Sequence, residues 1–251
     1  MRFLILTVGS RGDVEPFVAL ADKILKATTT PDNPNIIEFF VQPEYKGLVP
    51  LASSNNCCRV HTWPFTQQDF YTFLLDPKHG KEHENPRVRF VGVVADIIEG
   101  LVLPQWKQVL ETIDGTGVPD VIVTSALARS LAFALGAKWN NVPTALVHLQ
   151  PLLPNNYFPH SGQDADACVR AILKLTTQKE LPNNSKNATE QDESKYYETY
   201  AVLERYQHDF LQQGLDQMYQ DMGLSSSPSQ EVHNYWSPST FETNMAALCG
   251  Q

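Results

Sequence analysis

The residues with the clearest capacity for chemistry lie in a short loop near the N-terminus, Gly9-Ser10-Arg11-Gly12-Asp13-Val14-Glu15-Pro16. The carboxylate of Asp13 could accept a proton from a hydroxyl group. Gly9 and Gly12 allow backbone conformations and close approaches that a β-carbon would block. Aspartate is also favoured at helix N-termini, where its oxygen accepts a backbone N–H. The loop therefore predicts a site at Asp13, with a plain helix cap as the alternative reading.

The segments on either side of this loop predict a strand followed by a helix. Phe3–Val8 is an apolar run typical of a buried strand. After the loop, Phe17, Leu20, Ala21, Ile24 and Leu25 recur with helical spacing, and Glu15-Pro16 suits the first turn of that helix. A turn between a first strand and a first helix lies at the C-terminal edge of a parallel sheet, where open α/β folds bind ligands.

Further strands and helices alternate along the chain. Proline at position 104 is expected to split the helical pattern of residues 88–113 into two helices, because proline is unfavourable in a helix interior. A helix rich in small residues is expected over 126–139, ended by Asn140-Asn141. The alternation predicts an α/β fold, a Rossmann-like parallel sheet flanked by helices. The later strand candidates are 36–41, 57–63, 119–125 and 143–149.

Two other regions give weaker patterns. Residues 66–86 are aromatic and contain His79 and His83, and we interpret them as an irregular, mobile loop with only a faint metal-binding pattern. We expect no metal. A long helix is expected over 195–222, with Gly223 at its C-terminus.

Composition limits the function classes. The chain has 251 residues, a formal net charge of −9 and a pI near 5.2, which argues against nucleic-acid binding, since that requires basic surface. No apolar stretch reaches the roughly 18 residues that span a bilayer, and residues 1–8 lead into the glycine loop without a cleavage site. The four cysteines show neither metal-site nor disulfide spacing. These features predict a cytoplasmic globular protein.

The octapeptide of residues 9–16, in its strand–loop–helix context, resembles the N-terminal signature of GT-B glycosyltransferases, specifically the family 28 type that includes sterol and antibiotic glucosyltransferases. The resemblance implies an N-terminal, acceptor-binding Rossmann-like domain. It implies that Asp13 deprotonates the acceptor hydroxyl, with Gly9, Ser10, Arg11 and Gly12 forming the loop at the site. Arg11 either holds a donor phosphate or is a solvated loop residue. The chain departs from the plant-type pattern, because no histidine lies between Gly9 and Phe17.

The segment after the last strand candidate extends the resemblance. Gln150–His160 is rich in proline and aromatic residues, like the acceptor-pocket loop of sterol-type members. Tyr157, Phe158 and His160 are the candidate acceptor-binding residues, and a surface loop with buried aromatics is the alternative. We expect this loop and Pro43–Tyr45 to frame an apolar cleft that faces Asp13.

The resemblance implies an inverting hexosyltransferase that moves a hexose from a nucleotide-sugar, the co-substrate, to the hydroxyl of a lipid, sterol or other hydrophobic acceptor. No other cofactor is implied, and peripheral contact with a membrane is compatible with such acceptors. Residues 1–222 are expected to form the acceptor-binding domain and residues 223–251 a tail or truncated linker. No second phosphate-cradling loop follows, so we expect negligible UDP-sugar binding by this chain alone.

Several interpretations remain open, the first of which concerns where the domain that binds the nucleotide-sugar donor, the donor half, comes from. It belongs either to a longer gene product or to a separate chain. A non-catalytic module that binds a hydrophobic ligand is the alternative from another class. A dinucleotide site fits less well, because Arg11 and Val14 stand where its fingerprint requires glycine, and only Glu44 offers an acidic residue near the second strand.

Overall fold

A computed structural model describes residues 1–27, 34–49, 57–76, 86–147 and 211–224, apart from the side chains of residues 74 and 86–91. The chain divides into two units, Met1–Lys81 with Val93–Pro151, and Glu82–Gly92 with Leu152–Gln251. The first unit holds the sheet and the N-terminal loop. The boundary expected between residues 222 and 223 remains a prediction.

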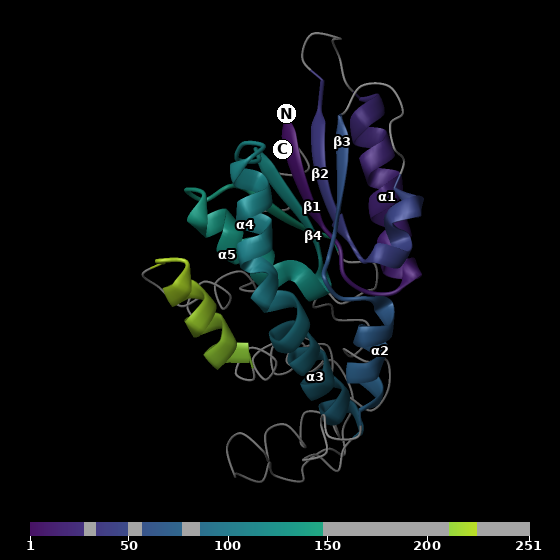
Figure 1. Cartoon of the computed structure of the whole chain (residues 1–251), viewed down its shortest axis with the longest axis vertical. Coiled ribbons are helices and arrows are strands. Elements are labelled where there is room, and N and C mark those ends of the chain that lie inside the picture. The colour runs from purple at the N-terminus through teal and green to yellow at the C-terminus, as the bar shows by residue number, and fades with distance from the viewer. Residues whose placement is uncertain (28–33, 50–56, 77–85, 148–210, 225–251) are drawn as a thin grey trace, which may run out of the picture. The chain divides into compact units, whose positions relative to one another are not determined.

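The first unit is built on a five-stranded, fully parallel sheet in the order β3-β2-β1-β4-β5 (Figure 1). Residue Phe3 of the central strand is in register with Ile37 on one side and Val121 on the other. The predicted fold class, a Rossmann-like parallel sheet flanked by helices, is confirmed. The strands are β1 (Arg2–Leu6), β2 (Ile36–Val41), β3 (Cys58–Thr62), β4 (Val121–Ser125) and β5 (Thr144–Val147).

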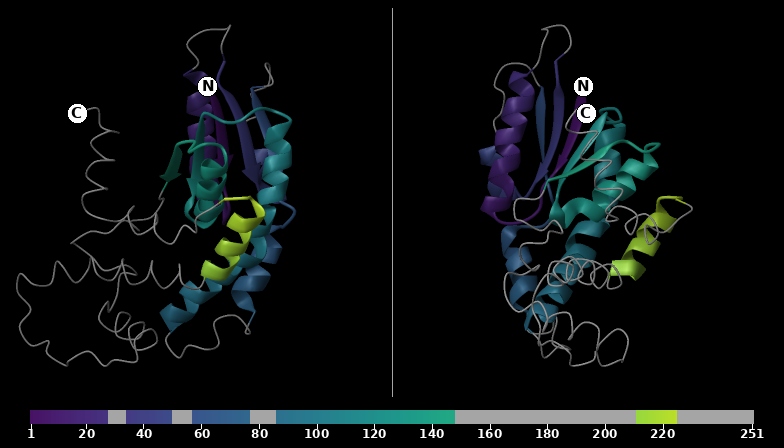
Figure 2. Two further views of the ribbon diagram at one scale, coloured as in Figure 1. Left: turned by 90° about the vertical axis from the view of Figure 1, so that its left-hand side faces the viewer. Right: turned by 180° about the vertical axis from the view of Figure 1, so that it is seen from behind.

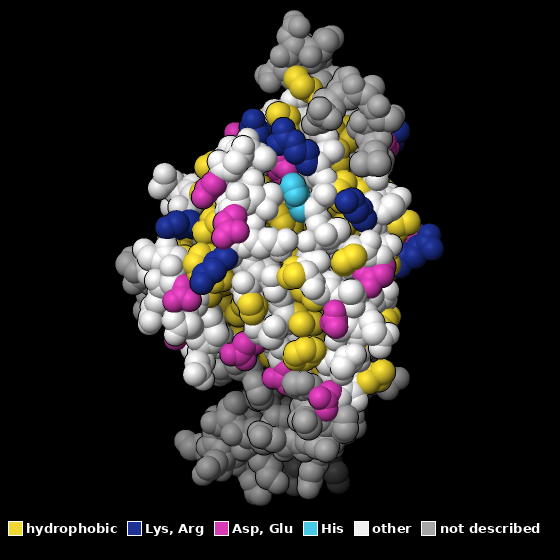
Figure 3. All heavy atoms as spheres, in the orientation of Figure 1, with side chains coloured by type: hydrophobic (Ala, Val, Ile, Leu, Met, Phe, Trp, Pro, Cys, Tyr) yellow, Lys and Arg dark blue, Asp and Glu magenta, His cyan; other side chains and the backbone are white. Residues whose placement is uncertain are grey.

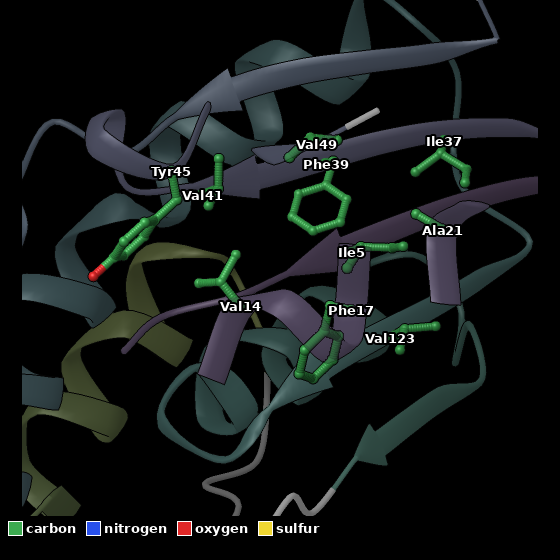
Figure 4. Packing of buried hydrophobic residues seen from close by; sticks show 10 residues of the cluster. All are labelled: Ile5, Val14, Phe17, Ala21, Ile37, Phe39, Val41, Tyr45, Val49 and Val123. Atoms are coloured by element: carbon green, nitrogen blue, oxygen red, sulfur yellow. The ribbon is translucent and has the colours of Figure 1, made fainter. Parts of the chain in front are cut away.

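Helices cover both faces of this sheet (Figures 1 and 2). Helix α1 (Arg11–Lys26) packs on one face, where Val14 and Phe17 contact the core formed by Ile5 and Phe39 (Figure 4). Helices α4 (Trp106–Asp114) and α5 (Arg129–Lys138) cover the opposite face. The three inner strands β1, β2 and β4 are largely buried and mostly apolar, as parallel strands covered on both faces usually are.

The remaining helical segments connect these layers. They are η1 (Pro43–Leu48), α2 (Gln67–Leu75), α3 (Pro86–Ile97), the π-helical turn η2 (Ile98–Val102) and the 3₁₀ turns η3 (Leu103–Gln105) and η4 (Ala126–Ala128). The predicted interruption at Pro104 is confirmed, since regular α-helix stops at Ile97 and resumes at Trp106. Inside the break, the side-chain amide of Gln105 donates to the Leu101 carbonyl at 2.9 Å and so pairs a backbone acceptor there.

Two expectations about helix starts were wrong. Helix α1 begins at Arg11, so Pro16 is its sixth residue rather than part of its first turn. The side chain of Asp13 reaches back to Ser10 and starts the helix earlier. The region expected to be irregular contains helix α2 over residues 67–75. Its N-cap residue is Thr66, whose backbone N and Oγ1 donate to the Asp69 carboxylate in the same way. Both sequences carry the Ser/Thr-x-x-Asp pattern that marks such starts.

The expected helix ends are confirmed where the structure describes them. Asn140 and Asn141 adopt φ values of 59° and 64° just after α5, a left-handed conformation that asparagine tolerates. In the second unit, residues 211–221 are helical and Gly223 follows with φ 70°. The Leu224 amide donates back to the Tyr219 carbonyl at 2.9 Å. The rest of the expected helix, and the histidines at 79 and 83, lie outside the described residues.

One buried carboxylate lies in the sheet itself. Glu38 of β2 accepts 2.7 Å hydrogen bonds from Arg59 Nη1 and His61 Nε2 of the edge strand β3, and its side chain is only 4% exposed. Burial raises the pKa of Glu38, but the His61 hydrogen bond and the Arg59 charge outweigh it, so the pKa lies below its ordinary value of 4.5. Charged side chains on an edge strand, such as the half-exposed Arg59 of β3, also disfavour pairing of that strand with other chains.

This cluster predicts acid-sensitive stability. Because the pKa of Glu38 is lowered by folding, its contribution is complete above the unfolded value and is lost as pH falls through the folded value. Glu38→Gln is expected to cost about 2 kcal/mol at neutral pH and to flatten the fall in unfolding free energy between about pH 6 and about pH 3. Denaturant titrations measure both. Glu15→Gln, in the exposed Arg11–Glu15 pair, is the control and should change stability little. An unchanged pH profile in Glu38→Gln would contradict the role assigned to this cluster.

The same region predicts an unreactive thiol. Burial, the charge of Glu38 and the neighbouring Cys57 raise the pKa of Cys58 to about 11. At about pH 8 only roughly one thiol in a thousand is then ionised, and the thiolate is the reactive form. Iodoacetamide should label Cys58 about a hundredfold more slowly than an unhindered thiol, as measured by peptide mass spectrometry. Labelling as fast as that of free cysteine would show that this thiol is not protected.

The surface shown in Figure 3 carries interspersed acidic and basic side chains, with hydrophobic ones between them. Within the described ranges, none of the helices combines the length and the apolarity needed to cross a membrane.

Candidate functional site

The candidate site lies at the C-terminal edge of the sheet, where the strand order changes direction. The chain runs from β1 outward to β2 and β3, and then returns to β4 on the other side of β1. Ligands of open parallel sheets bind at this position, because the loops that leave the two central strands diverge there. The loop was predicted over residues 9–16; residues 7–10, between β1 and α1, form the observed loop and occupy this edge, as does η4 after β4.

Three other strands, β2, β3 and β4, hold this loop in place. Each contributes a side chain at or just after its C-terminal end, and all three are buried. A loop pinned at three consecutive residues is rigid, and rigid support is what a precisely placed catalytic group requires. The hydrogen bonds join Trp63 Nε1 to Thr7 O at 2.7 Å, Gln42 Nε2 to Gly9 O at 2.7 Å, and Val8 N to Ser125 Oγ at 3.1 Å.

Asp13 is half-buried in the first turn of α1. Its Oδ2 accepts hydrogen bonds from Ser10 N at 2.7 Å and from Ser10 Oγ at 2.8 Å. No described residue donates a hydrogen bond to the second oxygen, Oδ1. The carboxylate is therefore fixed through one oxygen and keeps the other able to accept a proton or a hydrogen bond.

Gly9 makes this arrangement of Asp13 sterically feasible. Its φ is +141°, and a β-carbon there would lie 2.5 Å from Asp13 Oδ2 and 2.8 Å from Asp13 Cβ. Both the conformation and the contact require glycine. Gly12 has no such need, since it lies within the helix and a β-carbon would meet only Ser10 Oγ at 3.7 Å. The conformational role expected for Gly12 was therefore wrong, because α1 begins before it.

The hydrogen bonds of Asp13 alone do not distinguish a base from a cap. Asp69 makes the same pair of contacts at the start of α2, where Thr66 N and Thr66 Oγ1 both donate to Asp69 Oδ2 at 2.8 Å. Asp13 differs in its position, at the sheet edge where the strand order reverses. The capping role is thus established for Asp13, and the catalytic role remains a prediction.

Arg11 lies in an exposed ion pair. Its Nε contacts Glu15 Oε1 at 2.6 Å, and the two side chains are 68% and 50% exposed. Such surface pairs contribute about 0–1 kcal/mol, so an incoming anion could readily displace Glu15. Of the two interpretations of Arg11, this geometry favours the solvated one.

Within the described part of the chain, two buried polar groups near this loop have hydrogen-bonding capacity that no neighbour uses. The amide of Gln42 is fully buried and uses its nitrogen on Gly9 O, leaving Oε1 without a hydrogen bond. The hydroxyl of Tyr45, in η1, donates its proton to no acceptor among the described residues, although the residue is only 6% exposed. A buried polar group without a partner costs about 1–3 kcal/mol, so both atoms indicate the place of a ligand or a bound water.

Sequence reasoning found this neighbourhood only in part. Pro43–Tyr45 was expected to help frame an apolar cleft that faces Asp13; these residues lie in η1, directly after β2, and the cleft itself stays a prediction. The supporting roles of Gln42, Trp63 and Ser125 were missed. The available signal was position, because Gln42 directly follows the predicted strand 36–41 and Trp63 and Ser125 are the last residues of the predicted strands 57–63 and 119–125. Tyr157, Phe158 and His160 lie outside the described residues, so their part in the site stays a prediction.

Comparisons with known proteins give a weak structural likeness. No protein-family model matches the sequence, and no curated protein matches it. The structure is similar to the calicheamicin glycosyltransferase CalG4, with a TM-score of 0.41 and 13% identity over 94% of this chain. It is also similar to UGT2 of Phytolacca americana, solved with UDP-2-fluoro-glucose and pterostilbene, with a TM-score of 0.40 and 13% identity over 84% of this chain.

The chain spans less than half of those two proteins, 43% and 45% of their chains. At these scores the likeness does not establish a family. Function is therefore argued from the residues of the site.

Proposed function

We propose that this chain is the acceptor-binding half of an inverting hexosyltransferase of the GT-B type, with Asp13 as its base. The observation that carries the proposal is the Asp13 carboxylate itself. It is fixed through Oδ2 by Ser10, keeps Oδ1 open among the described residues, and stands at the sheet edge where the strand order reverses. This arrangement provides an oriented acceptor of protons at a position suited to ligand binding.

The proposed step requires one proton transfer and one displacement. Asp13 Oδ1 takes the proton of the acceptor hydroxyl while the hydroxyl oxygen forms a bond to the anomeric carbon of the sugar. The bond from that carbon to the nucleoside diphosphate breaks on the opposite face, and its electron pair leaves with the phosphate oxygen. A positioned base contributes about 10²–10⁴-fold to such a step, and holding the two reactants together contributes more.

The proposed substrates are a UDP-hexose and the hydroxyl of a sterol, lipid or similar apolar acceptor. The aromatic and proline-rich residues 150–160 support an apolar acceptor, because aromatic rings offer flat surfaces with a polar edge. The nucleotide-sugar would be bound by a donor-binding domain or a separate chain, and no metal or other cofactor is part of the proposal. Such acceptors would place the protein in the cytoplasm near a membrane surface.

A non-catalytic module that binds a hydrophobic ligand is the second candidate. The observation that favours it is that Asp69 accepts the same two hydrogen bonds from Thr66 as Asp13 accepts from Ser10. The contacts of Asp13 therefore also occur in a simple helix cap. Such a module would use the same sheet edge but would move no proton.

The two candidates are separated by a transfer experiment. The chain, joined to its donor-binding half as a longer gene product or a second polypeptide, is given labelled UDP-glucose and cholesterol, and lipid-extractable label is counted. Transfer supports the enzyme. Saturable cholesterol binding without transfer supports the binding module, and the absence of both with any apolar alcohol tested would contradict the proposed acceptor site.

A further inference from the structure

We propose that the hydroxyl of Tyr45 donates a hydrogen bond to the oxygen of the same acceptor alcohol that Asp13 deprotonates. This inference rests on the proposed function and adds a second binding residue to that site. The phenol keeps its own proton throughout. It contacts one lone pair of the acceptor oxygen, and another lone pair remains for attack on the sugar.

The position of Tyr45 supports this role. Its ring packs with Val14 and Val41 in the apolar cluster beneath α1, whereas its hydroxyl points away from that cluster (Figure 4). The ring is therefore immobilised by packing while its polar atom is directed out of the core. A tyrosine used only to fill the core would gain nothing from this oxygen, because phenylalanine packs equally well without a buried polar atom.

Electrostatic effects on Tyr45 show what surrounds its hydroxyl. Burial is the main cause that raises its pKa, and the charges of Tyr71, Glu44 and Asp13 add to it, whereas a hydrogen bond from the backbone amide of Arg11 to the phenol oxygen lowers it. The hydroxyl therefore stands near the first turn of α1, within the electrostatic range of Asp13. A raised pKa also keeps the phenol protonated at neutral pH, so that it remains a donor.

Together the two groups are complementary to one alcohol. An alcohol carries one hydrogen to donate and lone pairs to accept. Asp13 Oδ1 is an acceptor without a described donor, and Tyr45 Oη is a buried donor without an acceptor. A hydroxyl group placed between them satisfies both, whereas a carboxylate ligand would be repelled by Asp13 and a protonated amine, which has no lone pair, would leave Tyr45 without an acceptor.

The test compares Tyr45→Phe with the unmodified 251-residue chain, using 2-naphthol and 2-methoxynaphthalene as probes. Both probes have an oxygen that accepts from Tyr45, but only 2-naphthol donates to Asp13. Calorimetry measures affinity and differential scanning fluorimetry measures the melting temperature. The control is Tyr71→Phe on α2, where the hydroxyl is exposed and already accepts from Gln67 Nε2 at 2.9 Å.

We expect Tyr45→Phe to bind both probes about five- to tenfold more weakly and to melt at or above the temperature of the unmodified chain, since a buried hydroxyl whose proton has no described acceptor is removed. Tyr71→Phe should bind both probes normally. Normal binding by Tyr45→Phe, or a clear drop in its melting temperature, would overturn the role of Tyr45 and leave that of Asp13 intact. If the unmodified chain binds neither probe, the proposed acceptor site fails as well.

Discussion

Asp13→Asn is expected to slow sugar transfer on the order of 10²-fold or more while leaving acceptor binding nearly unchanged. The amide has the shape of the carboxylate, and its oxygen can still accept the two hydrogen bonds from Ser10. What it loses is the ability to take a proton from the acceptor hydroxyl. The cost in stability should therefore be at most about 1 kcal/mol. Initial rates with UDP-glucose and an apolar alcohol, measured beside thermal melting, separate the two effects.

Asp69→Asn is the matched control for that experiment. It makes the same substitution in a cap with the same two contacts, at the start of a helix to which no catalytic role is assigned. If both variants keep full transfer activity, Asp13 only caps the helix, and the loop has a structural role and no catalytic one. If only Asp13→Asn loses activity, the loss comes from the missing proton acceptor and not from a loosened helix start. Asp13→Ala should lose activity and, in addition, some helix stability.

The parallel sheet was predictable because apolar runs that alternate with helical patterns are compatible with few fold topologies. Residues 3–8 and 36–41 could be assigned to buried strands from hydrophobicity alone; the structure confirms the second with the same bounds and places the first at Arg2–Leu6. The helix starts were harder. At Ser10 and at Thr66, a capping aspartate three residues later decided the boundary, and this local effect outweighed the apolar periodicity on which the expectations were based.

The site was predictable only where it depended on backbone order. A loop after the first strand must lie at the C-terminal edge, so Asp13 could be placed there in advance. The supporting contacts of Gln42 and Trp63 depend on which strands become neighbours, and the unpaired hydroxyl of Tyr45 depends on packing between η1 and α1. Such facts need coordinates, because the residue types alone are equally compatible with solvent-exposed side chains.

Substitution at the two glycines of the loop gives the second large expected effect. Gly9→Ala should destabilise the protein by about 2–4 kcal/mol, because it combines a left-handed φ of +141° with a β-carbon placed 2.5 Å from Asp13 Oδ2. To relieve that contact, the Asp13 side chain must leave Ser10, so the variant should also lose transfer activity. Gly12→Ala makes the same change three residues later. There a β-carbon fits and α1 already includes the position, so stability should rise by a few tenths of a kcal/mol.

Denaturant titration and transfer rates of the two variants test this steric argument, because a methyl group should be harmful at position 9 and harmless at position 12. A stable and active Gly9→Ala protein would mean that Asp13 does not need the position described here, and the base assigned to the site would lose its geometric support. A stable Gly12→Ala protein that no longer binds 2-naphthol would carry different information. It would show that the ligand approaches the backbone of the first turn of α1 too closely for a methyl group, and would restore a role for Gly12 in ligand contact rather than in folding.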